Sequence, residues 1–181
     1  MKSAIIYYSY SGNTKKVADI LCASLREKGT VDIVELQSLD EPTSFLGQCR
    51  RALVKTKAQI KPVNLDLSGY DLICFGSPVW AFGPTPAMNT YLDKCSGLES
   101  KPIILLTTYG SGTGNQRCLH YMQGILKQKG VKQFSSFSIQ QFKVKDKEFV
   151  LRQIREMMRL WPNGYLPAGR QGAPGGRDKP L

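Results

Sequence analysis

Hydrophobic and polar positions alternate along this chain between two kinds of segment. Short apolar runs, typical of strands buried on both faces, are separated by longer segments with apolar residues at helical spacing. Residues 31–36 instead alternate between apolar and polar positions, which predicts a strand at the edge of a sheet. The predicted strands are residues 2–8, 31–36, 70–76, 102–108 and 133–140.

The segments between and after these strands show the spacing of amphipathic helices. Val17, Leu21 and Leu25, for example, recur at intervals of four. We expect Gly29 and Gly130 to end two of the helices and Asp146 to cap the last. The predicted helices are residues 13–28, 44–58, 86–95, 115–129 and 146–161. Strands that alternate with helices predict an α/β fold, a parallel sheet with helices on both faces.

The length of 181 residues is enough for one domain with its own core. We assign residues 1–161 to that domain and expect the Pro- and Gly-rich residues 162–181 to be disordered, because they can bury little apolar surface. No apolar run approaches the roughly 20 residues that cross a membrane, and the first strand leaves no room for a signal peptide. We therefore expect a cytoplasmic protein without a transmembrane segment.

Charge and cysteine content exclude several classes of function. The formal net charge of +11 is compatible with anionic partners, but no recognised nucleic-acid-binding module accompanies it. We therefore expect the basic residues on solvated faces and no nucleic-acid partner. The five cysteines are scattered, with no C-x-x-C pair, and are expected to be mostly buried. His120 is the only histidine, which argues against a metal cluster or a histidine-based triad.

The loop after the first strand carries the first candidate chemistry. Hydroxyl, amide and glycine residues stand here immediately before a helix, where backbone N–H groups and the helix dipole favour an anion. The loop lies at the carboxyl end of a strand, where open α/β sheets bind ligands, and a phosphate monoester is the natural occupant. A simple helix cap is the alternative. The residues are Ser9, Tyr10, Ser11, Gly12, Asn13 and Thr14.

Two further loops follow the strands at residues 70–76 and 102–108. The first holds Trp80 and Phe82 between prolines, and aromatic residues on a loop predict stacking against a flat ligand, with packing on neighbouring helices as the alternative. The second joins Tyr109 to a glycine-rich turn. A dinucleotide fingerprint there fails, because Asn115 replaces the required glycine and no acidic residue follows at the required distance. A strand order of 2-1-3-4-5 would bring all three loops together.

Three segments resemble the short-chain flavodoxin-like proteins. They are residues 9–19 (SYSGNTKKVAD), 70–92 (YDLICFGSPVWAFGPTPAMNTYL) and 104–115 (ILLTTYGSGTGN), within a resemblance that spans residues 1–161. The resemblance implies a doubly wound five-stranded parallel sheet of order 2-1-3-4-5, with FMN as the cofactor.

The resemblance also implies which residues bind FMN. The first loop, Ser9 to Thr14, would hold the phosphate. The isoalloxazine ring would be lined on one side by Pro78, Val79, Trp80, Ala81, Phe82 and Gly83, and closed on the other by Thr108, Tyr109, Gly110 and Gly114.

Three functions remain open at this point. The first is electron transfer by an FMN-binding carrier with a redox partner protein. The second is an NAD(P)H-dependent FMN oxidoreductase that reduces quinones or similar small acceptors. The third, an FMN-free binding module, is disfavoured by the intact first loop. If Trp80 and Tyr109 cover both flavin faces, hydride transfer is blocked and the carrier is favoured; an open face favours the enzyme.

Two departures from the carrier flavodoxins bear on this choice. Those proteins are strongly acidic and dock basic partners, whereas this chain is basic. The three loops also contain no Asp or Glu. Fewer anions near the flavin should ease its reduction to an anion and raise its potential.

Overall fold

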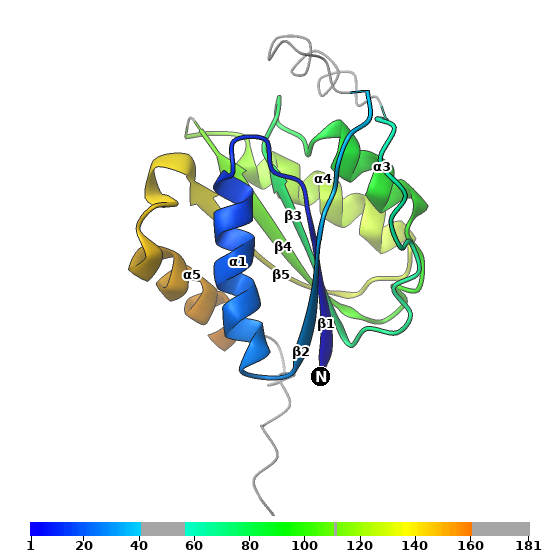
Figure 1. Cartoon of the computed structure of the whole chain (residues 1–181), viewed down its shortest axis with the longest axis horizontal. Helices are drawn as coiled ribbons and strands as arrows, with labels where there is room; N and C mark the ends of the chain where they lie inside the picture. Colours follow the sequence, from blue (N-terminus) through cyan, green and yellow to red (C-terminus); the bar gives the residue numbers. More distant parts are fainter. Residues whose placement is uncertain (41–56, 111, 161–181) are drawn as a thin grey trace, which may run out of the picture.

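The computed structural model describes residues 1–40, 57–110 and 112–160, and these residues build a five-stranded sheet (Figure 1). All four neighbouring strand pairs are parallel, in the order β2-β1-β3-β4-β5, which confirms the predicted topology. The strands are β1 (Lys2–Tyr7), β2 (Thr30–Glu35), β3 (Leu72–Pro78), β4 (Pro102–Tyr109) and β5 (Gln133–Gln140).

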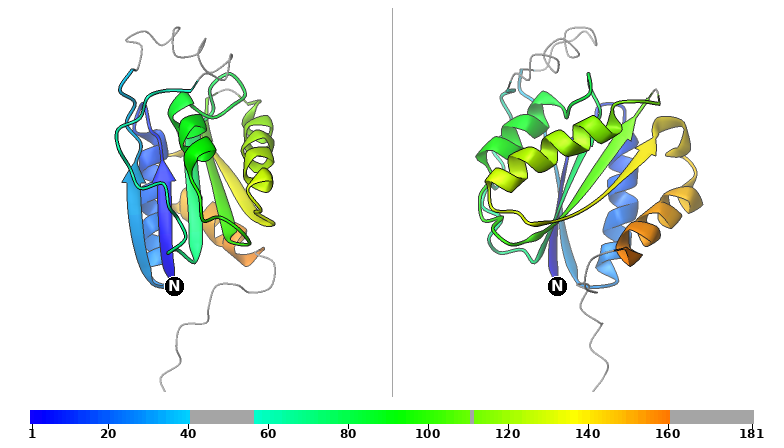
Figure 2. Two further views of the ribbon diagram at one scale, coloured as in Figure 1. Left: turned by 90° about the vertical axis from the view of Figure 1, so that its right-hand side faces the viewer. Right: turned by 180° about the vertical axis from the view of Figure 1, so that it is seen from behind.

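Helices cover both faces of the sheet, as Figure 2 shows. One face carries α1 (Asn13–Arg26) and α5 (Lys147–Arg159), and the other carries α3 (Pro86–Lys94) and α4 (Asn115–Gln128). A single 3₁₀ turn, η1 (Gln141–Lys143), joins β5 to α5. Within the described ranges, each helix is too short or too polar to span a lipid bilayer.

The core consists of two layers separated by the sheet. Along β1, Ile5 and Tyr7 pack into the layer beneath α1 and α5, whereas Ala4 and Ile6 pack into the layer beneath α3 and α4. Both sets are almost fully buried. This two-sided burial explains why the central strands are continuous apolar runs, while the edge strand β2 keeps exposed positions along its length.

Local signals set most helix ends. The Asp146 carboxylate accepts a hydrogen bond from the Phe149 N–H at 3.0 Å, which confirms the predicted cap of α5. Gly130 follows α4 with a φ of +80°, as expected for a glycine after a helix. The end of α1 differs, since the helix stops at Arg26 rather than Lys28. Position 29 requires glycine because the Met1 backbone lies close to it: a Cβ there would lie 2.0 Å from the Met1 carbonyl oxygen.

Two predicted features fall outside the described residues. Residues 44–56 of the predicted second helix lie there, and its last two positions, Lys57 and Ala58, are not helical. The predicted disordered segment, residues 162–181, also lies outside.

The four described cysteines are buried, as predicted. Burial raises the pKa of the Cys95 thiol to about 11 and that of Cys118 to about 12, so both stay neutral near pH 7. His120 is exposed on α4.

Candidate functional site

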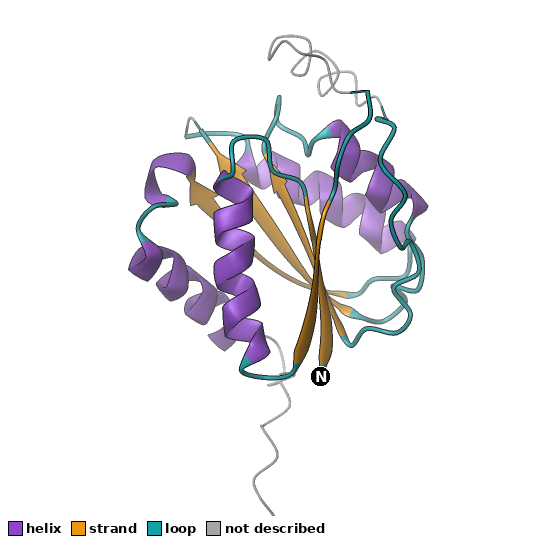
Figure 3. Cartoon of the chain, in the orientation of Figure 1, coloured by secondary structure: helices purple, strands orange, loops and turns teal. Residues whose placement is uncertain are grey.

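A cavity of about 430 Å³ opens at the carboxyl edge of the sheet. Figure 3 draws the loops after β1, β3 and β4 at this edge in teal, and the 3₁₀ turn η1 follows β5 there. The volume is within the usual range for small-molecule sites. The lining residues are Tyr10, Ser11, Asn13, Thr14, Pro78, Val79, Trp80, Thr108, Tyr109, Gly110 and Gln141.

The loop after β1 ends in Gly12, which precedes α1 with a left-handed φ of +77°. The Lys15 N–H, in the first turn of α1, donates to the Ser9 hydroxyl at 3.2 Å, so Ser9 supports the start of the helix. The Asn13 side-chain amide donates to the Ser11 hydroxyl, also at 3.2 Å. The first turn of α1 carries no acidic side chain, so nothing there opposes a bound anion.

A buried hydroxyl pair links α1 to β4. The Oγ1 atoms of Thr14 and Thr108 lie 2.8 Å apart, and both residues line the cavity. One hydroxyl donates to the other, so the second keeps a hydrogen that it can donate to an acceptor in the cavity. Gly76 of β3 lies in the same crowded region, since a Cβ there would lie 3.0 Å from the Tyr7 Cβ and 3.3 Å from the Leu106 Cδ2 atom.

Trp80 is less exposed than an aromatic on a loop is expected to be. Only 7% of its surface is accessible, and it belongs to the core layer beneath α3 and α4. Its ring meets the rings of Tyr8 and Tyr10 edge-on, each with a centroid distance of 5.8 Å. Packing on neighbouring helices, the alternative for Trp80, agrees with its place in the core layer beneath α3 and α4, although the residue still lines the cavity.

The loop after β3 continues into a tight two-residue turn. Trp80 and Gly83 exchange reciprocal backbone hydrogen bonds of 2.9 Å around Ala81 and Phe82. These central residues have φ values of +47° and +66°. Glycine, asparagine and aspartate are usual in such turns, and a left-handed conformation costs other residues about 1–2 kcal/mol each. Phe82, 47% exposed, lies at the tip.

Gln141 lines the cavity although no sequence motif marks it. It is the first residue after β5 and packs against Gly110, where a Cβ would lie 3.4 Å from the Gln141 Nε2 atom. The neighbouring Gln140 donates from its own Nε2 to the Gly110 carbonyl at 3.2 Å. The rule that ligands bind at the carboxyl ends of strands could have found Gln141, had it been applied to the fifth strand.

Most of the predicted site residues converge on the cavity, but some lie beside it. The residues that line it after β1 are Tyr10, Ser11, Asn13 and Thr14. Those at the ends of β3 and β4 and in the loops that follow are Pro78, Val79, Trp80, Thr108, Tyr109 and Gly110. None of the described lining residues is acidic, in agreement with the loop composition. The predicted residues that do not line it are Ser9, Gly12, Ala81, Phe82, Gly83 and Gly114.

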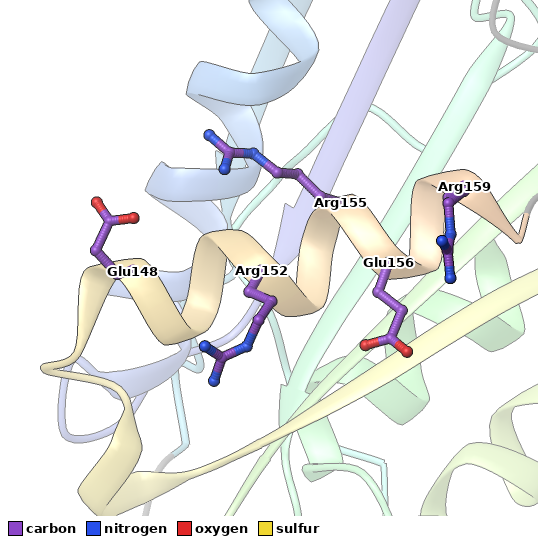
Figure 4. A pocket seen from close by; sticks show the side chains of 5 residues that line it. All are labelled: Glu148, Arg152, Arg155, Glu156 and Arg159. Atoms are coloured by element: carbon purple, nitrogen blue, oxygen red, sulfur yellow. The ribbon is translucent and has the colours of Figure 1, made fainter.

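A second cavity, of about 470 Å³, lies along α5 and is shown in Figure 4. It is lined by Glu148, Arg152, Arg155, Glu156 and Arg159, all of which belong to that one helix. Each is exposed, and the long side chains project from the helix into solvent (Figure 4). No backbone loop or aromatic ring contributes, so this cavity is a charged helix surface rather than a candidate for the cofactor.

The sheet order and the cavity at the carboxyl ends of its strands define a flavodoxin-like protein. Residues 1–143 match the NADPH-dependent FMN reductase family, and the chain belongs to this family. FMN, the cofactor expected from the resemblance, is the flavin of the family, which confirms that expectation.

Solved structures share the fold at low sequence identity. A flavoprotein in complex with FMN from Lactobacillus acidophilus is 20% identical, with a TM-score of 0.57 over 81% of this chain and 98% of that one. An NADH:FMN oxidoreductase is 16% identical, with a TM-score of 0.59 over 87% and 88%. Flavodoxin 2 from Bacillus cereus is 18% identical, with a TM-score of 0.56 over 86% and 99%. No protein of curated function matches significantly.

The residues of the cavity suit FMN. The start of α1 and the Thr14–Thr108 pair offer donors for a phosphate. Val79, Trp80 and Tyr109 offer apolar and aromatic surface for a ring. The absence of acidic residues from the described lining leaves the cavity suited to an anionic ligand.

Proposed function

We infer that this protein is an FMN-dependent oxidoreductase that draws electrons from NAD(P)H and delivers them to a quinone or a similar small acceptor. When bound, FMN would supply the redox chemistry, by which a hydride from the nicotinamide and one proton from solvent reduce the acceptor by two electrons. The proposal includes a cytoplasmic location. The near-complete burial of Trp80 is the observation that favours this enzyme over a carrier.

Trp80 has too little accessible surface to cover a flavin ring. A ring that covers a flavin must present one of its faces to the cavity. Trp80 has 7% of its surface accessible, because it packs in the core layer beneath α3 and α4 and against the rings of Tyr8 and Tyr10. In this position it forms part of the wall and cannot cover a ring face. Of the other two aromatic residues of the described lining, Tyr10 belongs to the loop assigned to the phosphate, so the half-buried Tyr109 is the one placed to cover a ring face.

The residues of the cavity divide into two groups by what they would do. Ser11, Asn13, Thr14 and Thr108 would bind the phosphate through hydroxyl, amide and backbone donors, with Ser9 supporting the start of α1. Pro78, Val79, Trp80, Tyr109 and Gly110 would orient the ring and exclude water from its buried side. An open face gives both the nicotinamide and the acceptor access to the ring, one after the other.

A reduction experiment without oxygen tests the proposal. The protein is loaded with FMN, passed through a desalting column to remove free flavin, and mixed with NADPH or NADH. We expect rapid loss of the absorbance of oxidised flavin and its return when methylnaphthoquinone is added. A protein that dithionite reduces but neither nicotinamide reduces would contradict the enzyme and favour the carrier. Failure to retain any FMN would contradict both.

A further inference from the structure

Phe82 is held beside the cavity in a position that several unrelated features maintain. It lies at the tip of the strained turn, with 47% of its surface exposed. Gly114, with a φ of +102°, faces it, and a Cβ on Gly114 would lie 2.7 Å from the Phe82 Cδ1 atom. Only glycine at position 114 leaves space for the Phe82 ring in this position. Residues held in such rare conformations are often found at functional sites.

Arg117 of α4 lies against the same ring. Its guanidinium carbon is 5.5 Å from the centroid of Phe82, the distance of a cation–π contact. Within the described residues, the ion pairs are Lys2–Asp32, Lys15–Asp19 and Lys57–Asp93, and Arg117 takes part in none of them. An exposed guanidinium positioned by an aromatic ring is suited to a carboxylate, sulfonate or phosphate, which it can bind through two parallel hydrogen bonds.

Phe82 and Gly114, on which its ring rests, belong to the loops after β3 and β4. Phe82 follows two residues after Trp80, and Gly114 ends the loop that begins at Tyr109; both Trp80 and Tyr109 line the cavity. The Val79 N–H donates to the Thr108 carbonyl at 2.8 Å, which ties the two loops together at their base. Phe82 and the start of α4, which carries Arg117, therefore follow directly from segments that contribute residues to the cavity.

We propose that Phe82 and Arg117 select ligands that combine a planar ring with an anionic group. Phe82 offers a surface on which the ring stacks, and Arg117 binds the anionic group. The proposal rests on the proposed function, since both an acidic quinone and a nicotinamide nucleotide have this chemistry. It makes Arg117 a determinant of specificity rather than of the reaction itself.

Ligand binding and turnover test the pair with Arg117→Gln and Phe82→Leu. The probes are naphthoquinone sulfonate, which is planar and anionic, and methylnaphthoquinone, which is planar and neutral. Binding to the FMN-loaded protein is measured by equilibrium dialysis, and KM is measured for both quinones and for NADPH. Arg152→Gln is the matched control, because Arg152 lies 5.3 Å from the ring of Phe149 on α5, away from the cavity.

For Arg117→Gln we expect about tenfold weaker binding of the anionic ligand, or a KM for it raised to the same extent, which is the effect of one charged hydrogen bond. The binding and the KM of methylnaphthoquinone should stay unchanged. Weaker binding of naphthoquinone sulfonate would mean that Arg117 binds the electron acceptor. A raised KM for NADPH would mean that it binds the electron donor. Phe82→Leu should weaken neutral and anionic ligands alike. Arg152→Gln should change nothing, and each variant should retain FMN.

Three results would overturn the pair. The first is that Arg117→Gln binds naphthoquinone sulfonate, and has a KM for NADPH, as the wild type does. The second is that this variant loses affinity equally for the neutral and the anionic quinone. The third is that Arg152→Gln weakens binding of the anionic quinone as much as Arg117→Gln does. Failure of the proposed function is distinguishable, because dialysis needs no turnover. A protein that binds naphthoquinone sulfonate through Arg117 but is not reduced by NADPH would refute the reaction and support the pair.

Discussion

Two of the cavities on the described part of this protein are similar in volume, yet they differ in how the chain builds them. The cavity at the edge of the sheet draws residues from the segments after four strands, and buried contacts such as the Thr14–Thr108 pair hold it in shape. The cavity on α5 is enclosed by exposed arginines and glutamates of a single helix (Figure 4). Cavity volume alone therefore does not identify a ligand-binding site. A better indication is that segments far apart in the sequence bring hydrogen-bond donors and aromatic rings to the same cavity.

The same contrast appears in two aromatic–cation pairs of nearly equal geometry. Arg117 lies 5.5 Å from the ring of Phe82, and Arg152 lies 5.3 Å from that of Phe149. The first pair rests on a strained turn and a glycine, whereas the second joins residues three positions apart on one helix. Neighbours on a helix meet without any special conformation, so the α5 pair is explained by helix geometry alone.

The largest expected effect comes from removing both hydroxyls of the buried pair. In the double variant Thr14→Val with Thr108→Val, FMN affinity should fall about 10- to 100-fold, because one charge-assisted hydrogen bond to the phosphate is lost. Quenching of FMN fluorescence on titration measures the change. Replacing both partners avoids a buried unpaired hydroxyl, so the free energy of unfolding should shift by less than about 1 kcal/mol. Unchanged FMN affinity would remove this pair from the site.

Gly114→Ala should destabilise the protein by about 1–3 kcal/mol. The new methyl group would overlap the Phe82 ring, and alanine tolerates the φ of +102° poorly. Urea unfolding measures the loss. Gly124→Ala, inside α4, is the control, since a Cβ there meets nothing within 4 Å and should stabilise the helix by about 0.5–1 kcal/mol. Equal behaviour of the two variants would mean that Phe82 is not held by Gly114.

The core layer beneath α3 and α4, which contains Cys95, should respond to alkaline pH. The pKa of Cys95 is about 11 when folded and 9.0 for a free thiol, so the unfolded chain ionises first and stability falls as pH rises through this window. From pH about 8 to about 10, Cys95 alone should cost about 1 kcal/mol. Urea unfolding of wild type and Cys95→Ala at both pH values checks this, and an equal pH dependence of the two would contradict it.

The smallest effect is expected on α5. Replacing Arg152, Arg155 and Arg159 together by Gln should leave FMN affinity unchanged and alter the free energy of unfolding by less than about 0.5 kcal/mol per site. The same fluorescence titration and urea experiments apply. A loss of FMN affinity comparable to that of the threonine double variant would abolish the distinction between the two cavities.

Sequence patterns predicted the sheet and most of the cavity because both follow from local chemistry. Continuous apolar runs identify strands buried on two sides, and parallel strands bring their loops to one edge. The conformation of individual loop residues was beyond reach. The burial of Trp80 depends on the distant Tyr8 and Tyr10, and nothing about alanine or phenylalanine indicates a positive φ at Ala81 and Phe82. Gln141 was missed because its position, not its type, makes it a lining residue.

The turn at Ala81 and Phe82 has a consequence for protein engineering. Glycine at position 81 would adopt the observed φ of +47° without penalty, while the Phe82 ring would remain. A glycine also loosens the unfolded chain, so the net gain in thermal tolerance should be modest. The same substitution would make the turn more pliable just where the aromatic tip borders the cavity. Thermal tolerance and substrate selection can therefore be tuned against each other at a single position.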